Sequence, residues 1–319
     1  MGEKQRTMST RAVVEGAVFA AVAVVMYILG PATQMVLTIA YPVPAALITQ
    51  RHGIRAGIMA SIVAALGIGM IMGPLDGLIC LTIVGLPGIV LGITMKKGLG
   101  WATSTLITGV VIAATTAADF VLGSLAIGIS PRLAWEEMHT AMAESVEMSR
   151  GLYERFGATP EMLSQLEATM ERTSQVLREL LPAFLLLSGL LFALAAYAIV
   201  RAVLLRMKTN VQPIDPFARW SMPTWLIWVP IAGLVLPLLG NYLKIDLVTA
   251  IGNNIFTGSM MLYMVHALSM LWFYMAKGNV PKLMRFIVCV FVYMTPLFSG
   301  LLPYAGVLDS FYDFRKLKS

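Results

Sequence analysis

Charged residues are scarce in this sequence, and their scarcity decides the class of protein first. Only 13% of the 319 residues are Asp, Glu, Lys or Arg, whereas 58% are hydrophobic, and the mean hydropathy is +0.79. Soluble globular domains carry about 25% charged residues. The composition therefore excludes an ordinary soluble protein and predicts a protein that crosses the membrane several times.

Cysteine and histidine are also scarce. The two cysteines, Cys80 and Cys289, lie far apart inside apolar runs, which excludes a disulfide framework and a cysteine metal site. The three histidines, His52, His139 and His266, fall in a predicted loop, a polar insertion and an apolar run. We therefore expect no metal centre and no cofactor.

Motifs for nucleotide hydrolysis and for hydrolytic catalysis are missing. No GxxxxGK[ST] phosphate loop, HExxH or GxSxG sequence occurs. We therefore expect that the protein is not an enzyme and does not hydrolyse ATP itself. The excess of 23 Lys and Arg over 17 Asp and Glu reports orientation in a membrane protein, and we expect no nucleic-acid partner.

Long apolar runs are what the sequence has in abundance. A membrane-spanning helix needs roughly 20 mostly apolar residues to cross about 30 Å of hydrocarbon. About nine such runs are present, at residues 12–29, 33–49, 54–72, 75–95, 101–129, 181–205, 223–240, 247–275 and 281–302. The predicted fold class is all-α, a polytopic integral membrane protein with about nine transmembrane helices.

The cationic residues fall on alternate connections between these runs. Because Lys and Arg accumulate in cytoplasmic loops, we expect a cytoplasmic N-terminus. The residues concerned are Lys4, Arg6 and Arg11, then Arg51 and Arg55, Lys96 and Lys97, Arg206, Lys208 and Arg219, and Lys277 and Lys282.

The C-terminal tail does not fit this alternation. Nine crossings would place Arg315, Lys316 and Lys318 outside, against the same rule. Two explanations stay open. Either breaks at Thr295-Pro296 and Ser299-Gly300 turn the last run into a re-entrant hairpin, which returns the tail to the cytoplasm, or the tail is an exception.

One long polar insertion, residues 131–179, carries nine acidic and five basic residues. Its apolar residues recur at helical spacing on two arms, which Gly157 and Thr159-Pro160 separate as a helix stop, a cap and a first-turn proline. We expect an extracellular antiparallel helical hairpin. Its apolar stripe is interpreted as the seam between the arms, with a surface for a partner or a lid as the alternative.

Small residues repeat at every fourth position in two of the runs. Such faces let a neighbouring helix approach closely, either within one chain or from another protein. The series in the third run predicts a packing face, and the first run has two parallel rows. These residues are Gly57, Ser61, Ala65, Gly69 and Gly73, and then Ala12, Gly16 and Ala20 beside Ala17 and Ala21.

The chain resembles the YybS-like family of bacterial membrane proteins, a domain of unknown function, over most of its length. The resemblance lies in the segments RAVVEGAVFAAVAVV, YPVPAALITQRHGIRAGI, GLPGIVLGITMKKG, LRELLPAFLLLSGLL and LPYAGVLDSFYDFRK. The first six runs in turn resemble the S components of energy-coupling-factor transporters. S components are six-helix proteins that bind a ligand in the outer half of the membrane.

The resemblance to S components implies a division of the chain. Residues 1–130 and 180–207 would form the six-helix core, 131–179 the extracellular hairpin, and 208–319 a C-terminal transmembrane extension. In S components an AxxxA face on the first helix contacts the coupling subunit, and Ala17 and Ala21 stand where that pattern would be, beside Gly16 and Ala20. The implied partners are a transmembrane coupling subunit with its ATPases, in addition to membrane lipid. The implied location is the bacterial cytoplasmic (inner) membrane.

Asp119 is the one charged residue between residues 98 and 130. An ionised Asp in hydrocarbon costs about 3 kcal/mol or more, so its side chain should face the bundle interior or water. Either Thr115 or Thr116, one turn back, and a neighbouring helix satisfy it, or it contacts a cationic or hydrogen-bond-donating ligand. Asp76 lies at similar depth, but an acid in a first helical turn also has a capping role.

These observations predict an S-component-like subunit that binds, and possibly imports, a small molecule. The candidate ligand-binding residues are Asp119, Thr115, Thr116 and Asp76. The alternative is a membrane scaffold or regulator that does not transport and that holds partners through the hairpin or the C-terminal region.

Overall fold

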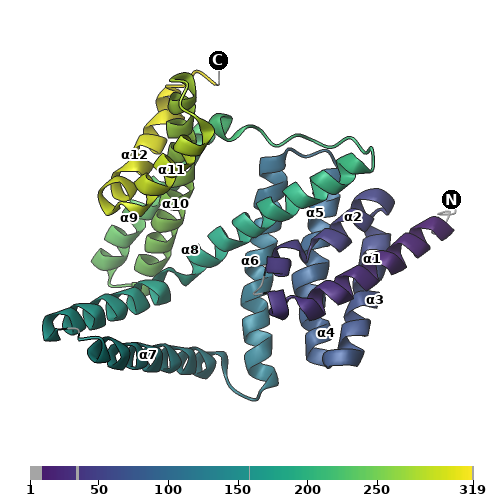
Figure 1. Cartoon of the computed structure of the whole chain (residues 1–319), viewed down its shortest axis with the longest axis horizontal. Coiled ribbons are helices and arrows are strands. Elements are labelled where there is room, and N and C mark those ends of the chain that lie inside the picture. The colour runs from purple at the N-terminus through teal and green to yellow at the C-terminus, as the bar shows by residue number, and fades with distance from the viewer. Residues whose placement is uncertain (1–8, 34–35, 158, 318–319) are drawn as a thin grey trace. The chain divides into compact units, whose positions relative to one another are not determined.

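The structure, a computed structural model, describes residues 9–33, 36–157 and 159–317 (Figure 1). Within these ranges all regular secondary structure is helical. The chain divides into one compact unit of Met1–Ser174 and Ser188–Pro213 and a second of Gln175–Leu187 and Ile214–Ser319. Of the cationic residues used for orientation, Lys4, Arg6 and Lys318 lie outside the described residues.

Seven helices in the described part of the chain are long and apolar enough to cross a membrane, or eight spans if one bent pair is counted. This confirms an all-α, polytopic membrane fold. The seven are Thr10–Leu29, Ile54–Met72, Pro74–Lys96, Trp101–Ala126, Glu179–Arg206, Thr224–Leu243 and Asp246–Lys277, and the bent pair is Lys282–Met294 with Pro296–Tyr312.

The first unit contains most of the predicted six-helix region. Its elements are α1 (Thr10–Leu29), η1 (Pro31–Thr33), η2 (Val36–Ala40), α2 (Val43–His52), α3 (Ile54–Met72), α4 (Pro74–Cys80), η3 (Leu81–Gly85), α5 (Leu86–Lys96), α6 (Trp101–Ala126), α7 (Pro131–Arg155) and part of α8 (Pro160–Arg206). The segment η3 is a π-helical turn that joins α4 to α5.

The run at residues 33–49 differs from the prediction of one span. Among the described residues of this run, only those of α2 are α-helical, and the ten residues of α2 cover about 15 Å, because Pro42 and Pro44 set the start of that helix. Tyr41 stacks on Tyr27 near the end of α1, whereas His52 bonds to Glu15 near its start. The segment η2–α2 thus returns antiparallel to α1, as a broken rather than a continuous helix.

The small residues of α3 form the predicted packing face. A Cβ at Gly77 of α4 would lie 2.6 Å from the carbonyl oxygen of Ala65, and a Cβ at Gly85 would lie 3.1 Å from Cβ of Ser61. Gly73 is different, because its φ of +119° places it in the turn between α3 and α4, where glycine is favoured. The backbones of α3 and the α4–η3–α5 segment therefore approach as closely as small residues allow.

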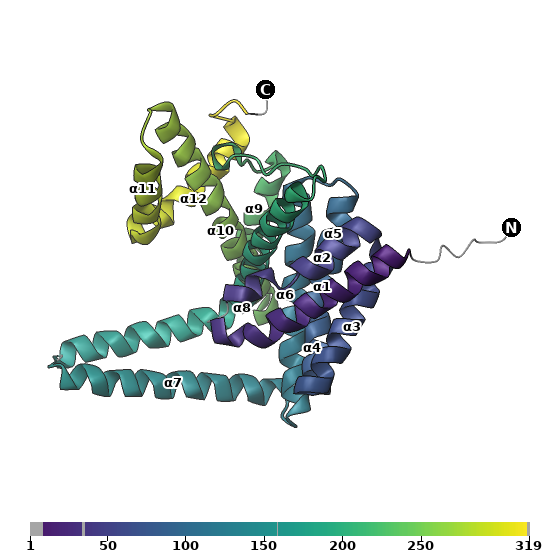
Figure 2. The same ribbon diagram turned by 45° about the vertical axis from the view of Figure 1, so that its right-hand side comes forward.

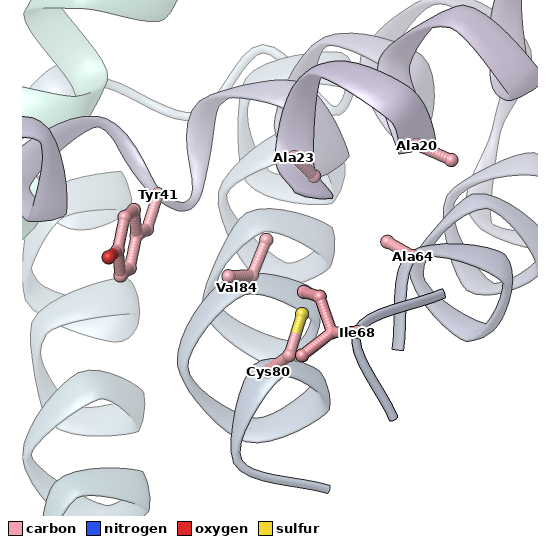
Figure 3. Close-up of a cluster of buried hydrophobic side chains, with 7 residues drawn as sticks. All are labelled: Ala20, Ala23, Tyr41, Ala64, Ile68, Cys80 and Val84. Atoms are coloured by element: carbon pink, nitrogen blue, oxygen red, sulfur yellow. The ribbon is translucent and has the colours of Figure 1, made fainter. Parts of the chain in front are cut away.

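Figure 3 shows the buried cluster that joins α1, α3 and the α4–η3 segment. Ala20 and Ala23 of α1 face Ala64 and Ile68 of α3, with exposed fractions between 0 and 4%. The short side chains bring the helices close, and Ile68 fills the remaining space. The cluster is completed by Tyr41, Cys80 and Val84.

Helices α7 and α8 form the predicted hairpin, and Figures 1 and 2 show α7 beside the first part of α8. The predicted cap is confirmed, because the side chain of Thr159 accepts from the N–H of Met162 and Gly157 has a φ of +81°. Oγ of Ser174 lies 3.3 Å from Nδ1 of His139 on the other arm.

The apolar stripe of the hairpin is only partly a seam. Leu166, Met170 and Leu177 are half-buried. Towards the connection between the arms, Met148 and Phe156 are 79% and 81% exposed. The seam interpretation therefore fits these three residues of the second arm, and the exposed end keeps the partner alternative open.

The second unit surrounds α10. Its elements are the residues 175–187 of α8, η4 (Phe217–Arg219), η5 (Thr224–Ile227), α9 (Trp228–Leu243), α10 (Asp246–Lys277), α11 (Lys282–Met294) and α12 (Pro296–Tyr312). Glycines again set the close contacts. A Cβ at Gly233 of α9 would lie 2.5 Å from the backbone nitrogen of Phe256, and one at Gly306 of α12 would lie 2.5 Å from the Tyr263 carbonyl oxygen.

The last apolar run is broken at the predicted place. The axes of α11 and α12 differ by 105° across Thr295, and Pro296 begins α12 without an N–H group. After α12, Arg315 donates to the carbonyl oxygens of Ala218 and Trp220. The tail therefore lies at the same end of this unit as the loop before α9, which is the arrangement expected of a re-entrant hairpin.

Candidate functional site

Asp119 on α6 meets a residue of the π-helical turn η3. Its Oδ1 accepts a hydrogen bond of 2.6 Å from Oγ1 of Thr82. The Thr82 hydroxyl also lies near backbone oxygens of its own helix, the nearest being that of Ile79 at 2.8 Å. Because a hydroxyl has one proton and the Asp119 contact is the shortest, Thr82 is the donor to the carboxylate.

The second carboxylate oxygen of Asp119 is in a different situation. Oδ2 is buried, and none of the described residues donates a hydrogen bond to it. A buried acceptor without a donor costs about 1–3 kcal/mol, and more when it is charged. One half of this carboxylate is therefore without a donor in the described chain.

Thr115 and Thr116 do not satisfy Asp119, which corrects that interpretation of the sequence. Their hydroxyls donate to the carbonyl oxygen of Ile112 at 3.0 and 2.8 Å, as hydroxyl side chains inside helices often do. Thr115 is buried and Thr116 is exposed. Thr82 was missed, although its sequence signal is visible as the one hydroxyl residue between residues 77 and 93.

The π-helical turn explains how Thr82 reaches α6. A π-helical turn shifts the side chains that follow it relative to an uninterrupted α-helix, and such turns are frequent at functional sites. Here the turn covers Leu81–Gly85 and is followed by Pro87, which has no N–H to donate to the helix. Thr82 is thereby placed on a segment of irregular helix opposite Asp119.

Asp76 has its own partner on α1. Its Oδ1 lies 3.4 Å from the hydroxyl of Tyr27, and the hydroxyl of Tyr41 donates to the backbone oxygen of Tyr27 at 3.2 Å. Asp76 lies in the first turn of α4, after Pro74. In the described residues no hydrogen bond joins Asp76 to Asp119, so the two acids belong to separate contacts.

An apolar groove of about 430 Å³ lies between α3 and α4. Residues such as Ala65, Gly69 and Gly77 line it, and Asp119 is not among the lining residues. Its composition suits lipid chains rather than a polar ligand. The groove is therefore separate from the polar contact of Asp119.

The four candidate partner residues of α1 point in two directions. Gly16 and Ala20 are buried within the first unit, whereas Ala17 and Ala21 are exposed. Ala20 belongs to the buried cluster of Figure 3, whereas a Cβ at Gly16 would meet nothing within 4 Å. The face left for a partner contains Ala17 and Ala21 with exposed valines, namely Val13, Val14, Val18 and Val25.

A charged cluster joins α1 to α2 and was not predicted. Glu15 Oε2 lies 2.5 Å from Nη1 of Arg51 and 2.8 Å from Nε2 of His52, and Oε1 lies 2.9 Å from Nε of Arg11. Three basic groups thus surround one carboxylate. The arrangement ties the start of α1 to the end of α2.

A second polar cluster is buried in the second unit, around Arg315. Its Nε and Nη2 both face Oδ2 of Asp309 at 2.9 Å. Nη1 donates to the Ala218 oxygen and to Oγ of Ser269, and Nη2 donates to the Trp220 oxygen. Each of the three guanidinium nitrogens thereby has at least one acceptor. The sequence showed only a cationic tail here, because the partners come from distant segments.

His266 completes this cluster. Its Nδ1 accepts from the N–H of Met222 at 3.0 Å, so the ring proton is assigned to Nε2, which lies 2.9 Å from Oδ2 of Asp309. His266 therefore makes an interhelical hydrogen bond from α10 to α12. With a neutral imidazole, the cluster contains one negative and one positive charge.

No group of three or more His, Cys, Asp or Glu side chains in the described ranges is arranged to hold a metal ion. The two polar clusters are instead ion pairs and hydrogen bonds of the protein with itself. Two buried carboxylate oxygens have no donor among the described residues, Oδ2 of Asp119 and Oδ1 of Asp309; the second belongs to a carboxylate whose other oxygen is paired with Arg315, so Asp119 is the acid without a cationic partner.

Comparison with known proteins places the chain in a family. Residues 18–310 match the family described as "Predicted membrane protein (DUF2232)". The chain is 25% identical over 311 residues to a Bacillus subtilis (strain 168) protein named "Uncharacterized protein YybS", and the match covers 96% of this chain and 98% of that protein. No solved structure matches the chain. The similarity to S components stays an expectation, whereas the chain belongs to the DUF2232 family of predicted membrane proteins.

Proposed function

We propose that the protein binds a small molecule at Asp119 and Thr82, and serves as a substrate-binding subunit similar to an S component. The observation that carries this proposal is the buried Oδ2 of Asp119, which has no donor among the described residues. Thr82 holds the other oxygen at 2.6 Å and thereby orients the carboxylate. A ligand that donates a hydrogen bond to Oδ2 would complete the site.

The chemistry of the site favours a ligand with a cationic or hydrogen-bond-donating group. A carboxylate accepts hydrogen bonds and attracts positive charge, and a charge-assisted bond is stronger at low dielectric than in water. Asp119 is 18 residues beyond Trp101, the start of α6, or about 27 Å along a helix. With the proposed cytoplasmic N-terminus and inner-membrane location, this depth is in the outer half of the membrane.

The test is mass spectrometry of the full chain purified in mild detergent. We expect a stoichiometric small molecule in the unmodified protein. Asp119→Asn preserves shape but removes the charge, and should lower occupancy at least 10-fold, because hydrogen bonds to charged groups contribute about 1.5–3 kcal/mol. Thr82→Val should lower occupancy less, because it removes the orienting bond and not the charge.

A matched control is Thr116→Val, which removes an exposed hydroxyl of the same helix that bonds to its own backbone. This variant should keep the ligand. The proposal fails if the unmodified protein carries no ligand, or if Asp119→Asn retains it at full occupancy. Size-exclusion chromatography of each variant separates loss of the ligand from loss of the fold.

The energy for import would come from partners. We propose that Ala17 and Ala21 on the exposed face of α1 contact a transmembrane coupling subunit that carries ATPases, as the resemblance to S components implies. Small residues permit close approach of a second helix. Two things support this part of the proposal: the exposure of Ala17 and Ala21 on α1, and the resemblance of the chain to S components.

A membrane scaffold or regulator is the second candidate. The exposed Met148, Phe156 and Met162 near the end of the hairpin favour it, because large apolar side chains exposed together are typical of interaction surfaces. Copurification of another protein with the unmodified chain, without any small molecule, would support this function in place of ligand binding.

A further inference from the structure

The hydroxyl of Thr82 lies among more acceptor oxygens than it can serve. Oδ1 of Asp119 is 2.6 Å from Oγ1 of Thr82, the Ile79 carbonyl oxygen is 2.8 Å away and the Leu78 carbonyl oxygen 3.3 Å away. A hydroxyl carries one proton, and here that proton goes to the carboxylate. The contacts of Oγ1 with the two carbonyl oxygens therefore have no proton between their atoms.

The backbone carbonyl of Thr82 also lacks its helical donors. In the π-helical turn the N–H of Leu86 donates to the carbonyl oxygen of Leu81, five residues earlier, and not to that of Thr82, four residues earlier. The next residue, Pro87, has no N–H to donate at the five-residue spacing. The Thr82 carbonyl is thus without a donor at both the α-helical and the π-helical spacing.

Asp119 brings a negative charge to this group of oxygen atoms. Its buried Oδ2 has no donor, and no positively charged group among the described residues pairs with its carboxylate. Asp76 bonds instead to Tyr27, so a single carboxylate sets the charge. A buried charge is costly unless an opposite charge accompanies it. The site is therefore rich in acceptors, poor in donors and in need of one positive charge.

We propose that Asp119, Thr82 and the backbone oxygens around Thr82 hold one monovalent cation. The inference rests on the proposed ligand site at Asp119 and narrows its ligand to a chemical class. One carboxylate balances one positive charge, whereas a divalent ion would keep an uncompensated charge. The neutral oxygens suit either source of such a charge, because they coordinate a free alkali ion or accept the N–H groups of an organic ammonium.

The break in the helix suits this role. Irregular backbone at membrane depth is tolerated where protein buries it or where it lines a cavity, and carbonyl oxygens at breaks in membrane helices coordinate Na⁺ in transporters. The segment α4–η3 and helix α6 both belong to the first compact unit. The site is therefore complete within that unit.

The test is thermal denaturation of the full chain, purified in mild detergent and dialysed into choline chloride. Choline is a quaternary cation without an N–H group, and it keeps the ionic strength constant. NaCl, KCl or methylammonium chloride is then exchanged for choline chloride. At least one of them should raise the denaturation midpoint saturably, because a ligand of the folded state stabilises it. A rise with an alkali chloride identifies a free ion, and a rise with methylammonium alone identifies an ammonium group.

Two variants connect the effect to the site. Asp119→Asn keeps the shape and removes the charge, and should raise the cation concentration at half effect at least 10-fold. Pro87→Ala supplies an N–H for the Thr82 carbonyl and should raise this concentration by a smaller factor. It also covers the case in which Asp119→Asn does not fold. Asp246→Asn, which removes an exposed acid of α10, is the matched control and should leave the titration unchanged.

The site is overturned if no cation raises the midpoint above that in choline chloride. It is also overturned if Asp119→Asn titrates like the unmodified chain, or, where that variant does not fold, if Pro87→Ala does. A copurified organic ligand without positive charge, lost in Asp119→Asn, would overturn the cation site and leave the proposed function standing. Stabilisation by Na⁺ or K⁺ with no organic molecule in the mass spectrum would support the cation site and contradict small-molecule binding.

Discussion

Asp309 and Arg315 form a salt bridge of 2.9 Å whose side chains are 2% and 1% exposed. The bridge joins α12 to the tail that follows it, and the other donors of Arg315 reach α10 and the loop before α9. A buried ion pair contributes little net stability in many proteins, but removing one partner leaves an uncompensated charge. The position of the tail therefore depends on both residues.

Replacing Asp309 by Asn should destabilise the protein strongly. Arg315 would keep its charge in a buried site without the carboxylate, and the loss expected for a broken buried pair is about 3–5 kcal/mol. Chemical denaturation of the purified protein in micelles measures the change. Asp246→Asn is the control, since Asp246 is an exposed acid at the start of α10. A loss below about 1 kcal/mol in Asp309→Asn would contradict a structural role for the pair.

The side of the membrane that the tail faces can be measured by labelling. In a background without Cys80 and Cys289, a cysteine at Lys316 should behave like one at Asn210, in the loop after α8. If α11 and α12 form a re-entrant hairpin and the N-terminus is cytoplasmic, both should react with a membrane-impermeant maleimide only after cells are permeabilised. A cysteine at Ser149 in the hairpin should react in intact cells. Labelling of Lys316→Cys in intact cells would show that α11 and α12 cross the membrane together.

The close packing of α3 and α4 predicts a strong effect of one methyl group. Gly77→Ala would place a Cβ 2.6 Å from the Ala65 carbonyl oxygen, so the helices must move apart, at a cost of about 1–3 kcal/mol. Gly123→Ala adds the same group on α6, where nothing lies within 4 Å, and should be neutral or slightly stabilising. The comparison uses the thermal denaturation midpoint of each variant. Equal midpoints would show that the two backbones are not in contact.

The two rows of small residues on α1 should respond differently to enlargement. Ala20→Leu should destabilise the protein, because Ala20 is 3% exposed inside the cluster of Figure 3. The double variant Ala17→Leu/Ala21→Leu should fold normally, because both positions are exposed, but should lose any coupling partner by holding its helix away.

Pull-down from native membranes, with crosslinking, measures the partner, and thermal denaturation measures the fold. Recovery of ATPases with the unmodified chain and not with the double variant is the expected result. Absence of any ATPase with the unmodified chain would contradict the coupled role and favour the scaffold function.

Much of the fold was predictable because it depends on local and compositional signals. Apolar runs long enough to cross a membrane predicted an all-α polytopic protein, and Gly157 with Thr159-Pro160 predicted the turn of the hairpin. The second run was misread as a continuous span, because its hydropathy does not show that Pro42 and Pro44 confine the α-helix to ten residues.

The contacts of the polar residues were not predictable in the same way. The sequence by itself determined that Asp119 and His266 would lie in apolar helices and would need partners, since an unpaired polar group in hydrocarbon is costly. Only the tertiary structure decided that Thr82, 37 positions away, bonds to Asp119, and that Asp309, 43 positions away, bonds to His266. The partners of Asp119 and His266 depend on how the helices pack, and Thr82 also lies in the π-helical turn at Leu81–Gly85. Long-range contacts between helices, rather than neighbours in sequence, set which side chains meet.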